Sequence, residues 1–247
     1  MGKHPQTIVR IALVIGAAVL CATGCAKRGT TGDTVFLHEV RDGETLEIIA
    51  DDYYGDPSLS STLAAYNEVS EKWVAPGTVL RVPMSDDDVE RRRIREKALV
   101  PYNSGLELVA GSAYVDAVSR FREAIEIDPG FADAHYNLGV TFQKMKAYDR
   151  ARDELRTACR LRPFDPRYFY ALGNANFHLQ RYDDAAEAFE AVLEQDPVHK
   201  KAAYSLAISY EKLERFNDAR VAWERYLELD SRSTWAAEAR KHLERLQ

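Results

Sequence analysis

Apolar and polar residues follow three different patterns along the chain. Residues 11–22 form one uncharged, almost continuous apolar run. Residues 35–83 contain short apolar segments separated by glycine- and proline-containing turns, a pattern typical of a small unit with strands and helices. From residue 98 onward, apolar residues recur at the three- and four-residue spacing of amphipathic helices. The pattern predicts an N-terminal leader, then a small α+β unit, then an all-α region.

A strand, two helices and a second strand are expected in the α+β unit. Residues 35–40 favour a strand because they are rich in β-branched and aromatic residues. After a turn at Asp42-Gly43, a first helix is predicted to bury the side formed by Leu46, Ile48, Ile49 and Tyr53. A second helix is predicted to bury the stripe formed by Leu59, Leu63 and Tyr66. A turn at Pro76-Gly77 leads into the last strand.

This order of elements, with these turn residues, resembles a LysM domain over residues 35–84. The resemblance is carried by Val40, Asp42 to Leu46, Ile49-Ala50, Asn67, Pro76-Gly77 and residues 79–83. It implies a βααβ fold that binds glycans containing N-acetylglucosamine, such as peptidoglycan. The implied glycan-binding residues are Gly43, Glu44, Thr45, Leu46, Asn67, Pro76 and Gly77, and Leu46 or Trp73 could shield a sugar face. A structural role is the alternative for each, because Thr45 can cap a helix and the glycines can form turns.

The all-α region repeats every 34 residues, in units that start at residues 98, 132, 166 and 200. The eighth and twentieth positions of each unit hold small residues: Gly105, Gly139, Gly173 and Ala207, then Ala117, Ala151, Ala185 and Ala219. The twenty-fourth position holds the large residues Phe121, Leu155, Phe189 and Trp223. The first unit, residues 98–131, departs most from the pattern, because Pro101 and Ser104 lie in its leading helix.

A 34-residue period with these columns resembles the tetratricopeptide repeat, a superhelical solenoid of helix pairs. The four repeats cover residues 98–131, 132–165, 166–199 and 200–233, and residues 234–247 are predicted to form a capping helix. In this family the leading helices line a groove that holds a protein segment. The implied groove residues are Tyr102, Tyr136, Asn137, Tyr170, Asn174, Phe177 and Tyr204. Packing between repeats is the alternative role for these tyrosines.

Two further segments are interpreted as structural. Residues 85–97 hold five acids and five bases, and we expect a solvated helical linker rather than a site for nucleic acid. Cys159 occupies the repeat position held elsewhere by Ile125, Leu193 and Leu227, so it is predicted to be a small buried residue.

The N-terminal leader ends in the order Ala22-Thr23-Gly24-Cys25, which resembles the lipobox of bacterial lipoprotein signal peptides. The resemblance implies that residues 1–24 are a signal peptide, that Cys25 is lipidated, and that residues 25–34 form a tether. In that family, Ala26 after the cysteine favours sorting to the outer membrane of Gram-negative bacteria. The alternative is an ordinary signal peptide or a buried helix with incidental cysteines.

Composition and motifs exclude several other classes of protein. The net charge of −6 opposes a nucleic-acid partner, and no HExxH, CxxC, GxSxG or phosphate-binding glycine loop is present. We therefore predict no enzyme activity, no cofactor and no metal. The sequence predicts an outer-membrane lipoprotein facing the periplasm, anchored by its lipid, that binds peptidoglycan and a protein partner. A scaffold for an envelope complex without glycan binding is the alternative, and a peptidoglycan hydrolase is a third hypothesis.

Overall fold

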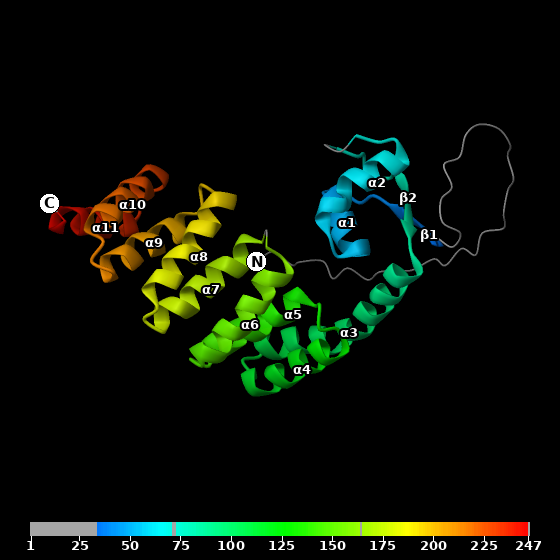
Figure 1. Cartoon of the computed structure of the whole chain (residues 1–247), viewed down its shortest axis with the longest axis horizontal. Coiled ribbons are helices and arrows are strands. Elements are labelled where there is room, and N and C mark those ends of the chain that lie inside the picture. Colours follow the sequence, from blue (N-terminus) through cyan, green and yellow to red (C-terminus); the bar gives the residue numbers. More distant parts are fainter. Residues whose placement is uncertain (1–33, 71–72, 164, 247) are drawn as a thin grey trace, which may run out of the picture. The chain divides into compact units, whose positions relative to one another are not determined.

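The computed structural model describes residues 34–70, 73–163 and 165–246. The chain divides into two compact units, residues 1–94 and 95–247, and each is described by itself. The predicted signal peptide and Cys25 lie outside the described residues. The helices and strands follow one another along the chain in the order labelled in Figure 1.

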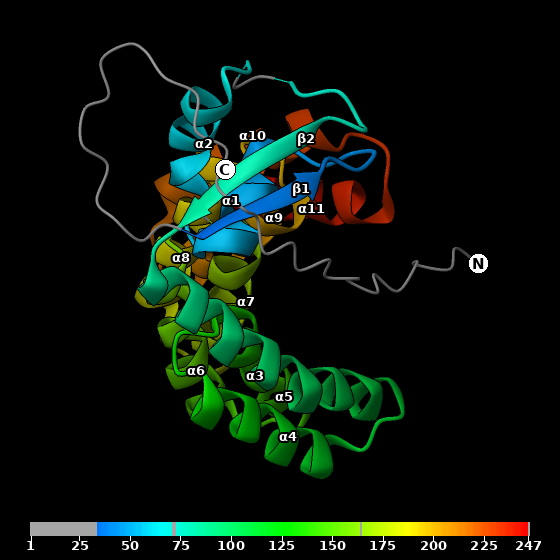
Figure 2. The same cartoon turned by 90° about the vertical axis from the view of Figure 1, so that its right-hand side faces the viewer.

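The first unit pairs two strands and packs two helices against them. Strand β1 (Thr34–Glu39) and strand β2 (Val79–Met84) are antiparallel, with Phe36 opposite Val82 and His38 opposite Leu80. The two strands lie side by side in Figure 2. Between them come helix α1 (Leu46–Tyr54), the short 3₁₀ helix η1 (Pro57–Leu59) and helix α2 (Ser60–Asn67). This is the expected βααβ order.

The core of the first unit differs from the sequence prediction at three positions. Leu46 and Ile49 of α1 are buried, but Ile48 is 51% exposed. Residues 46, 49, 50 and 53 share one side of a helix at 3.6 residues per turn, whereas residue 48 points elsewhere. In the second predicted stripe only Leu63 is buried, while Leu59 and Tyr66 are exposed. The helices are therefore placed as predicted, but the prediction that Ile48, Leu59 and Tyr66 belong to the core is wrong.

The charged segment and the leading helix of the first repeat form one continuous helix, α3 (Asp86–Ala110). Three acidic residues occupy its first turn, where the helix dipole favours negative charge. The helix continues through Pro101, which is buried. The secondary structure therefore has no break at residue 97, where the sequence analysis separates linker from repeat.

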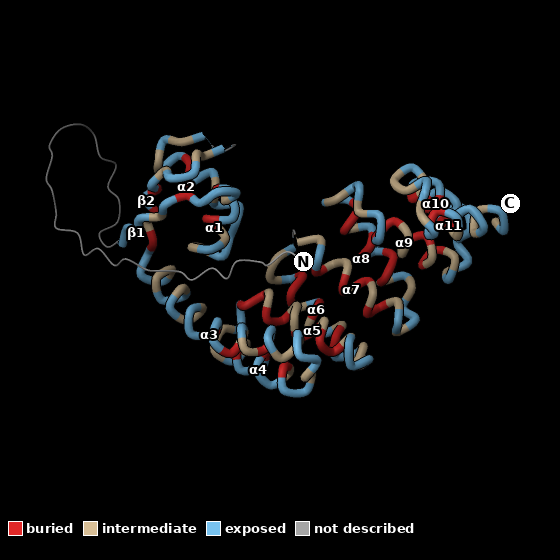
Figure 3. The backbone as a smooth tube through the Cα atoms, turned by 180° about the vertical axis from the view of Figure 1, so that it is seen from behind, coloured by how far each residue is buried: buried red, intermediate tan, exposed pale blue. Residues whose placement is uncertain are grey.

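The second unit is all helical over its described residues. After α3, its helices are α4 (Tyr114–Ile127), α5 (Ala132–Lys144), α6 (Tyr148–Leu161), α7 (Pro166–His178), α8 (Tyr182–Gln195), α9 (Lys200–Lys212), α10 (Phe216–Leu229) and α11 (Thr234–Arg245). They form a solenoid of helix pairs closed by α11, which confirms the predicted fold class. Buried residues run along the helix faces that contact one another (Figure 3).

Small residues at the eighth position allow the two helices of a repeat to approach closely. A Cβ atom added at Gly173 would lie 2.5 Å from Cε1 of Phe189, and one at Gly139 would lie 2.6 Å from Cγ of Leu155. These distances are far below van der Waals contact, so the columns of small and large residues are complementary. Cys159 is 7% exposed in a cluster with Ala132, Ala158 and Tyr168, and burial raises the pKa of its thiol to about 12. The predicted structural role of Cys159 is confirmed.

The turn inside each repeat has one geometry that recurs every 34 residues. Ser112, Lys146, Gln180 and Glu214 all have φ between 58° and 62°, the left-handed region. The N–H of each following residue donates to the carbonyl oxygen five residues before it, for example Arg181 N to Asn176 O at 2.9 Å. This is the six-to-one hydrogen bond of a Schellman motif. Because Ser112 shares it, the divergent first repeat turns in the same way as the others.

Candidate functional site

The two turns that carry most of the predicted glycan-binding residues lie at the same end of the first unit's sheet. The backbone of Val40 joins them: its N–H donates to Thr78 O at 2.8 Å, and its carbonyl accepts from Gly77 N at 2.7 Å. Gly43 and Gly77 both adopt positive φ, at 81° and 84°, a conformation that glycine tolerates best. Gly43, Thr45, Pro76 and Gly77 are exposed, so their backbone groups are accessible.

Glu44 is held by a polar network next to the first of these turns. Its Oε2 accepts hydrogen bonds from the Arg41 N–H at 2.8 Å and from His38 Nε2 at 2.9 Å. Tyr53 packs edge-on against His38, with ring centroids 5.6 Å apart. Burial acts to raise the pKa of Glu44, but the hydrogen bonds from Arg41 and His38 and the positive charges nearby lower it overall. The Glu44 side chain therefore fixes the turn, which limits its capacity to bind a ligand.

Two predicted site residues have structural roles. The Leu46 side chain is 2% exposed and packs in the core, so the prediction that it shields a sugar is wrong. Asn67 joins α2 to β2, because its Nδ2 donates to Arg81 O at 2.8 Å and its Oδ1 accepts from Arg81 N at 2.6 Å. Asn67 Nδ2 also donates to Leu63 O. The Asn67 amide is thus used within the fold, where it holds Arg81, four residues after Gly77 along the chain.

Two apolar side chains close to the turns in sequence are exposed. Trp73 is 70% exposed, and Ile48, whose N–H is capped by Thr45 Oγ1 at 3.3 Å, is 51% exposed. Sequence reasoning named Trp73 but assigned Ile48 to the core. The helical spacing around Leu46 and Ile49 would have identified Ile48 as a surface residue.

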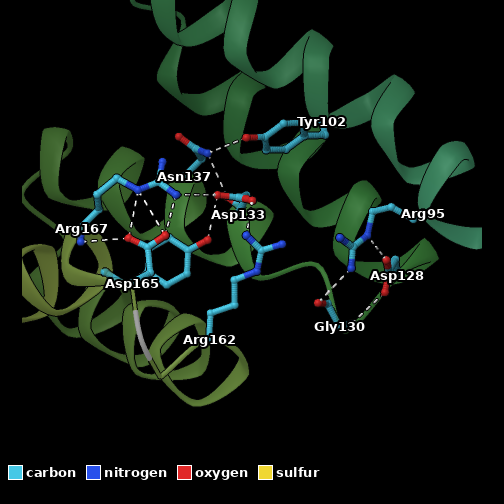
Figure 4. Close-up of polar contacts among 10 residues, drawn as sticks. Arg95, Tyr102, Asp128, Gly130, Asp133, Asn137, Arg162, Asp165 and Arg167 are labelled. Carbon is cyan, nitrogen blue, oxygen red and sulfur yellow. Dashed lines mark hydrogen bonds and ion pairs between the residues drawn. The ribbon is translucent and has the colours of Figure 1, made fainter. Parts of the chain in front are cut away.

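In the second unit, the predicted groove residues of the first two repeats contact one another. Asn137 Nδ2 donates to Tyr102 Oη at 2.9 Å, and the Tyr102 ring packs on Phe131 with centroids 4.6 Å apart. Figure 4 shows Asn137 of α5 directed toward Tyr102 of α3, and Asn137 Nδ2 also donates to the backbone oxygen of Asp133. Burial is the main cause that raises the pKa of the Tyr102 hydroxyl to about 12.

The other predicted tyrosines also pack within the repeats. Tyr136 stacks on the buried Tyr168 at 4.9 Å, and Tyr170 meets Phe189 at 5.8 Å. Tyr204 contacts the rings of Trp223, Tyr226 and Trp235 at 4.9, 5.2 and 5.0 Å. Asn174 and Phe177 of α7 are half-buried, and Phe177 meets the ring of Tyr182 at 5.3 Å. These tyrosines therefore contribute to packing and still present part of their surface.

Sequence reasoning missed a charged cluster beside Tyr136. Asp133 accepts a hydrogen bond from Tyr168 Oη at 2.8 Å and lies 3.5 Å from Arg162 and 3.6 Å from Arg167. Arg167 also pairs with Asp165 at 2.6 Å, as Figure 4 shows. The sequence could have indicated this cluster, because Arg162 occupies a repeat position at which the other repeats have Asp128, Asp196 and Asp230. In the first repeat, Asp128 pairs instead with Arg95.

Metal-binding clusters and membrane-spanning helices are both absent from the described part of the chain. No group of three or more His, Cys, Asp and Glu side chains in residues 34–70, 73–163 and 165–246 is arranged to hold a metal ion. Within the same residues, no helix is long and apolar enough to cross a membrane.

Comparison with known families agrees with this architecture. The LysM domain family matches residues 38–83, and the tetratricopeptide repeat family matches residues 108–175 and 170–234. The chain is a LysM domain followed by tetratricopeptide repeats. Both are typically non-catalytic binding modules; LysM domains are associated with glycans and tetratricopeptide repeats with protein partners.

Solved structures resemble the repeat fold at low sequence identity. The crystal structure of MamA protein is 18% identical with a TM-score of 0.55, over 61% of this chain and 90% of that chain. MamA from Desulfovibrio magneticus RS-1 is 19% identical with a TM-score of 0.54, over 61% of this chain and 93% of that chain. At this identity the likeness shows the fold alone. Among curated proteins, no relative matches the chain.

Proposed function

We propose that the chain is a non-catalytic adaptor of the bacterial cell envelope that binds peptidoglycan through its LysM domain and a protein through its repeats. The observation that carries the proposal is the presence of both module types in one chain, at residues 38–83 and 108–234. The exposed turns at Gly43 and Gly77 support glycan binding, since backbone groups at turns can hydrogen-bond to acetamido groups. In this proposal a lipid on Cys25 anchors the chain in the outer membrane, facing the periplasm.

Glycan binding is tested by co-sedimentation of the lipid-free protein with insoluble peptidoglycan. Trp73→Ala removes an exposed ring three residues before Pro76 in the sequence, and we expect binding to weaken about fivefold to tenfold, the order of one aromatic contact. Trp235→Ala is the matched control, because Trp235 is 60% exposed but lies in the repeats. Wild-type protein that stays in the supernatant at low salt would refute glycan binding.

The protein partner is tested by photocrosslinking in living cells. A photoreactive residue at Asn174, on the predicted groove face of α7, should capture a defined protein, whereas one at Val221 should not. Val221 is 61% exposed on α10 and is not one of the predicted groove residues. The double variant Tyr136→Ala, Tyr170→Ala should weaken capture, whereas Tyr136→Phe should retain it. Equal capture from both crosslinker positions would contradict the groove.

One observation favours a second function, that of a scaffold for an envelope complex without glycan binding. Glu44, Leu46 and Asn67 are committed to internal contacts, so fewer side chains of the LysM domain are free for a sugar. Crosslinking at Asn174 without co-sedimentation would support this function. Mass spectrometry of the native protein tests the anchor, because a diacylated or triacylated Cys25 at the amino end is expected.

A further inference from the structure

The two edges of the LysM sheet differ, because the outward backbone groups of β2 are bound by side chains. The N–H of Arg81 donates to Asn67 Oδ1 at 2.6 Å, and the Arg81 carbonyl oxygen accepts from Asn67 Nδ2 at 2.8 Å. The carbonyl oxygen of Pro83 accepts from Tyr54 Oη at 2.9 Å, and proline has no N–H to present. Side chains from α1 and α2 thus close the edge of the sheet at β2.

These contacts also fix which residues of β1 direct their backbone groups away from β2. In an antiparallel pair of strands, hydrogen-bonded and non-hydrogen-bonded pairs of residues alternate. Leu37 lies opposite Arg81, and Val35 lies opposite Pro83. Because those groups of β2 are directed toward the helices, both pairs are non-hydrogen-bonded, so the N–H and carbonyl groups of Leu37 and Val35 point away from β2. The same alternation directs the backbone groups of Glu39 outward.

The outward backbone groups of β1 are unbound. Within the part of the chain that the structure describes, no hydrogen bond reaches the outward N–H or carbonyl oxygen of Val35, Leu37 or Glu39. The side chains of these residues are exposed, with values of 38% for Val35 and 62% for Leu37. Lysine, proline or a bulge commonly blocks pairing at an edge strand, and β1, with the sequence TVFLHE, has none of them. The edge at β1 is therefore open to a further strand.

A second copy of β1 fits this edge with every outward group paired. In an antiparallel arrangement about a two-fold axis at Leu37, that residue lies opposite Leu37 of the second copy, and Val35 lies opposite Glu39 of the second copy. In each such pair the two residues exchange both of their N–H to carbonyl hydrogen bonds. This register pairs all three outward residues of β1 with one another.

The side chains of β1 favour the same register. It brings the two Leu37 side chains together on the outer face of the sheet, so the most exposed apolar side chain of β1 packs against its equivalent. Glu39, the one acidic residue of β1, meets Val35 of the second copy. A two-fold axis at Glu39 would instead place two carboxylates opposite each other, which is destabilising. The strand is thus complementary to itself in hydrogen bonds, apolar contact and charge.

We propose that two copies of this chain associate through their β1 strands into one four-stranded antiparallel sheet. The strand order is β2 and β1 of one copy, followed by β1 and β2 of the other. Three pairs of residues make a small interface, below the roughly 1,200–2,000 Å² that stable complexes bury, so the dimer is in reversible equilibrium with the monomer. The association uses neither the glycan-binding turns nor the groove of the repeats.

The test combines sedimentation equilibrium with amide hydrogen exchange of the lipid-free protein over a range of protein concentrations. The average mass should rise from monomer toward dimer as the concentration increases. Exchange of the Val35, Leu37 and Glu39 amides should slow over the same range. The Phe36 and His38 amides, which face β2 in both states, should not change. A mass that stays monomeric at every concentration would overturn the proposal.

Three variants distinguish this edge from other surfaces. Leu37→Lys places two like charges at the two-fold axis and should weaken association at least about tenfold, with an unchanged circular dichroism spectrum. Val79→Lys is the matched control, because Val79 is 57% exposed on the outer face of β2, and it should leave association unchanged. Val35→Pro removes an outward N–H that the sheet does not use, so it should weaken association and keep the fold. Equal effects of Leu37→Lys and Val79→Lys would contradict the proposed edge.

Photocrosslinking in living cells identifies the occupant of the edge. A photoreactive residue at Leu37 should capture a second copy of this chain, whereas one at Val79 should not. Capture of only a different protein at Leu37 would show that the edge receives another partner and would overturn the proposal. None of these results depends on peptidoglycan binding or on capture at Asn174.

Discussion

The two units of this chain place their structural polar and small residues in different ways. In the repeats, the same role recurs every 34 residues, as the left-handed turn residues Ser112, Lys146, Gln180 and Glu214 illustrate. In the LysM domain each role is filled once: Glu44 holds one turn, and Asn67 holds α2 against β2. When equivalent residues recur at one position of every repeat, the recurrence indicates a structural role. A residue that occurs only once offers no such comparison, so the sequence does not distinguish its structural role from a functional one.

This difference explains where sequence reasoning succeeded. Cys159 was assigned correctly because three other repeats place apolar residues at its position. Leu46 had no such comparison within the chain, and it was assigned to a glycan site although it is buried. Departures from a column are informative for the same reason: Arg162 stands in a column of aspartates, although sequence reasoning did not single it out.

The largest expected effect is on stability, and it tests whether the eighth position of a repeat must hold a small residue. Gly173→Ala places a Cβ atom 2.5 Å from Phe189 Cε1 and should lower the free energy of unfolding of the repeats by about 2–3 kcal/mol, as overpacking does. Gly111→Ala is the control, because its nearest neighbour would be 3.6 Å away, and it should change stability by less than about 0.5 kcal/mol. Denaturant unfolding followed by circular dichroism measures both. Equal losses of stability in the two variants would show that the close approach of the helices does not determine which residue occupies the eighth position.

The next effect tests the single amide of the LysM domain. Asn67→Ala removes three hydrogen bonds that involve Leu63 and Arg81, and it should destabilise the domain by about 1–2 kcal/mol, since water can reach the exposed Arg81 backbone. Hydrogen exchange of the α2 and β2 amides measures the loss, with Asn217→Ala, at an exposed repeat position, as the control. Weaker peptidoglycan binding with unchanged exchange would instead assign Asn67 to the glycan site.

A smaller effect distinguishes two tyrosines in the repeats. Tyr168→Phe deletes the buried hydroxyl that donates to Asp133 at 2.8 Å, and it should cost about 1 kcal/mol, because Arg162 and Arg167 still neutralise Asp133. Tyr136→Phe should be close to neutral, since the ring stack with Tyr168 remains. Thermal unfolding of both variants measures the two losses of stability. Identical losses would mean that the stack, rather than the hydrogen bond, is sensitive to the change.

The smallest effect is a pH dependence confined to the LysM domain. Glu44 has a pKa below its ordinary value of 4.5 in the fold, so its stabilising contribution is complete above about pH 4.5 and is lost as the pH falls through the folded value. Glu44→Gln should therefore be less stable than wild type at pH 7, and this difference should shrink at pH 3. Glu47→Gln, at an exposed position on the same helix, is the control. A difference independent of pH would exclude this role for the carboxylate.

The sequence by itself determined the order of the modules and the placement of the turns. These depend on local properties: hydrophobic period, positive-φ glycines and a recurring register. The helical spacing is also sufficient to predict that Ile48 is exposed, because a residue two positions from Leu46 cannot share the buried face of the helix.

Tertiary structure alone decided how individual side chains are used. Asn67 meets Arg81 and Tyr102 meets Asn137 across distances in sequence that no local pattern encodes. The continuity of α3 through Pro101 likewise depends on which neighbours surround that residue. Secondary structure follows from short-range preferences, whereas burial, pairing and cavities are set by contacts between segments that are brought together only when the chain folds.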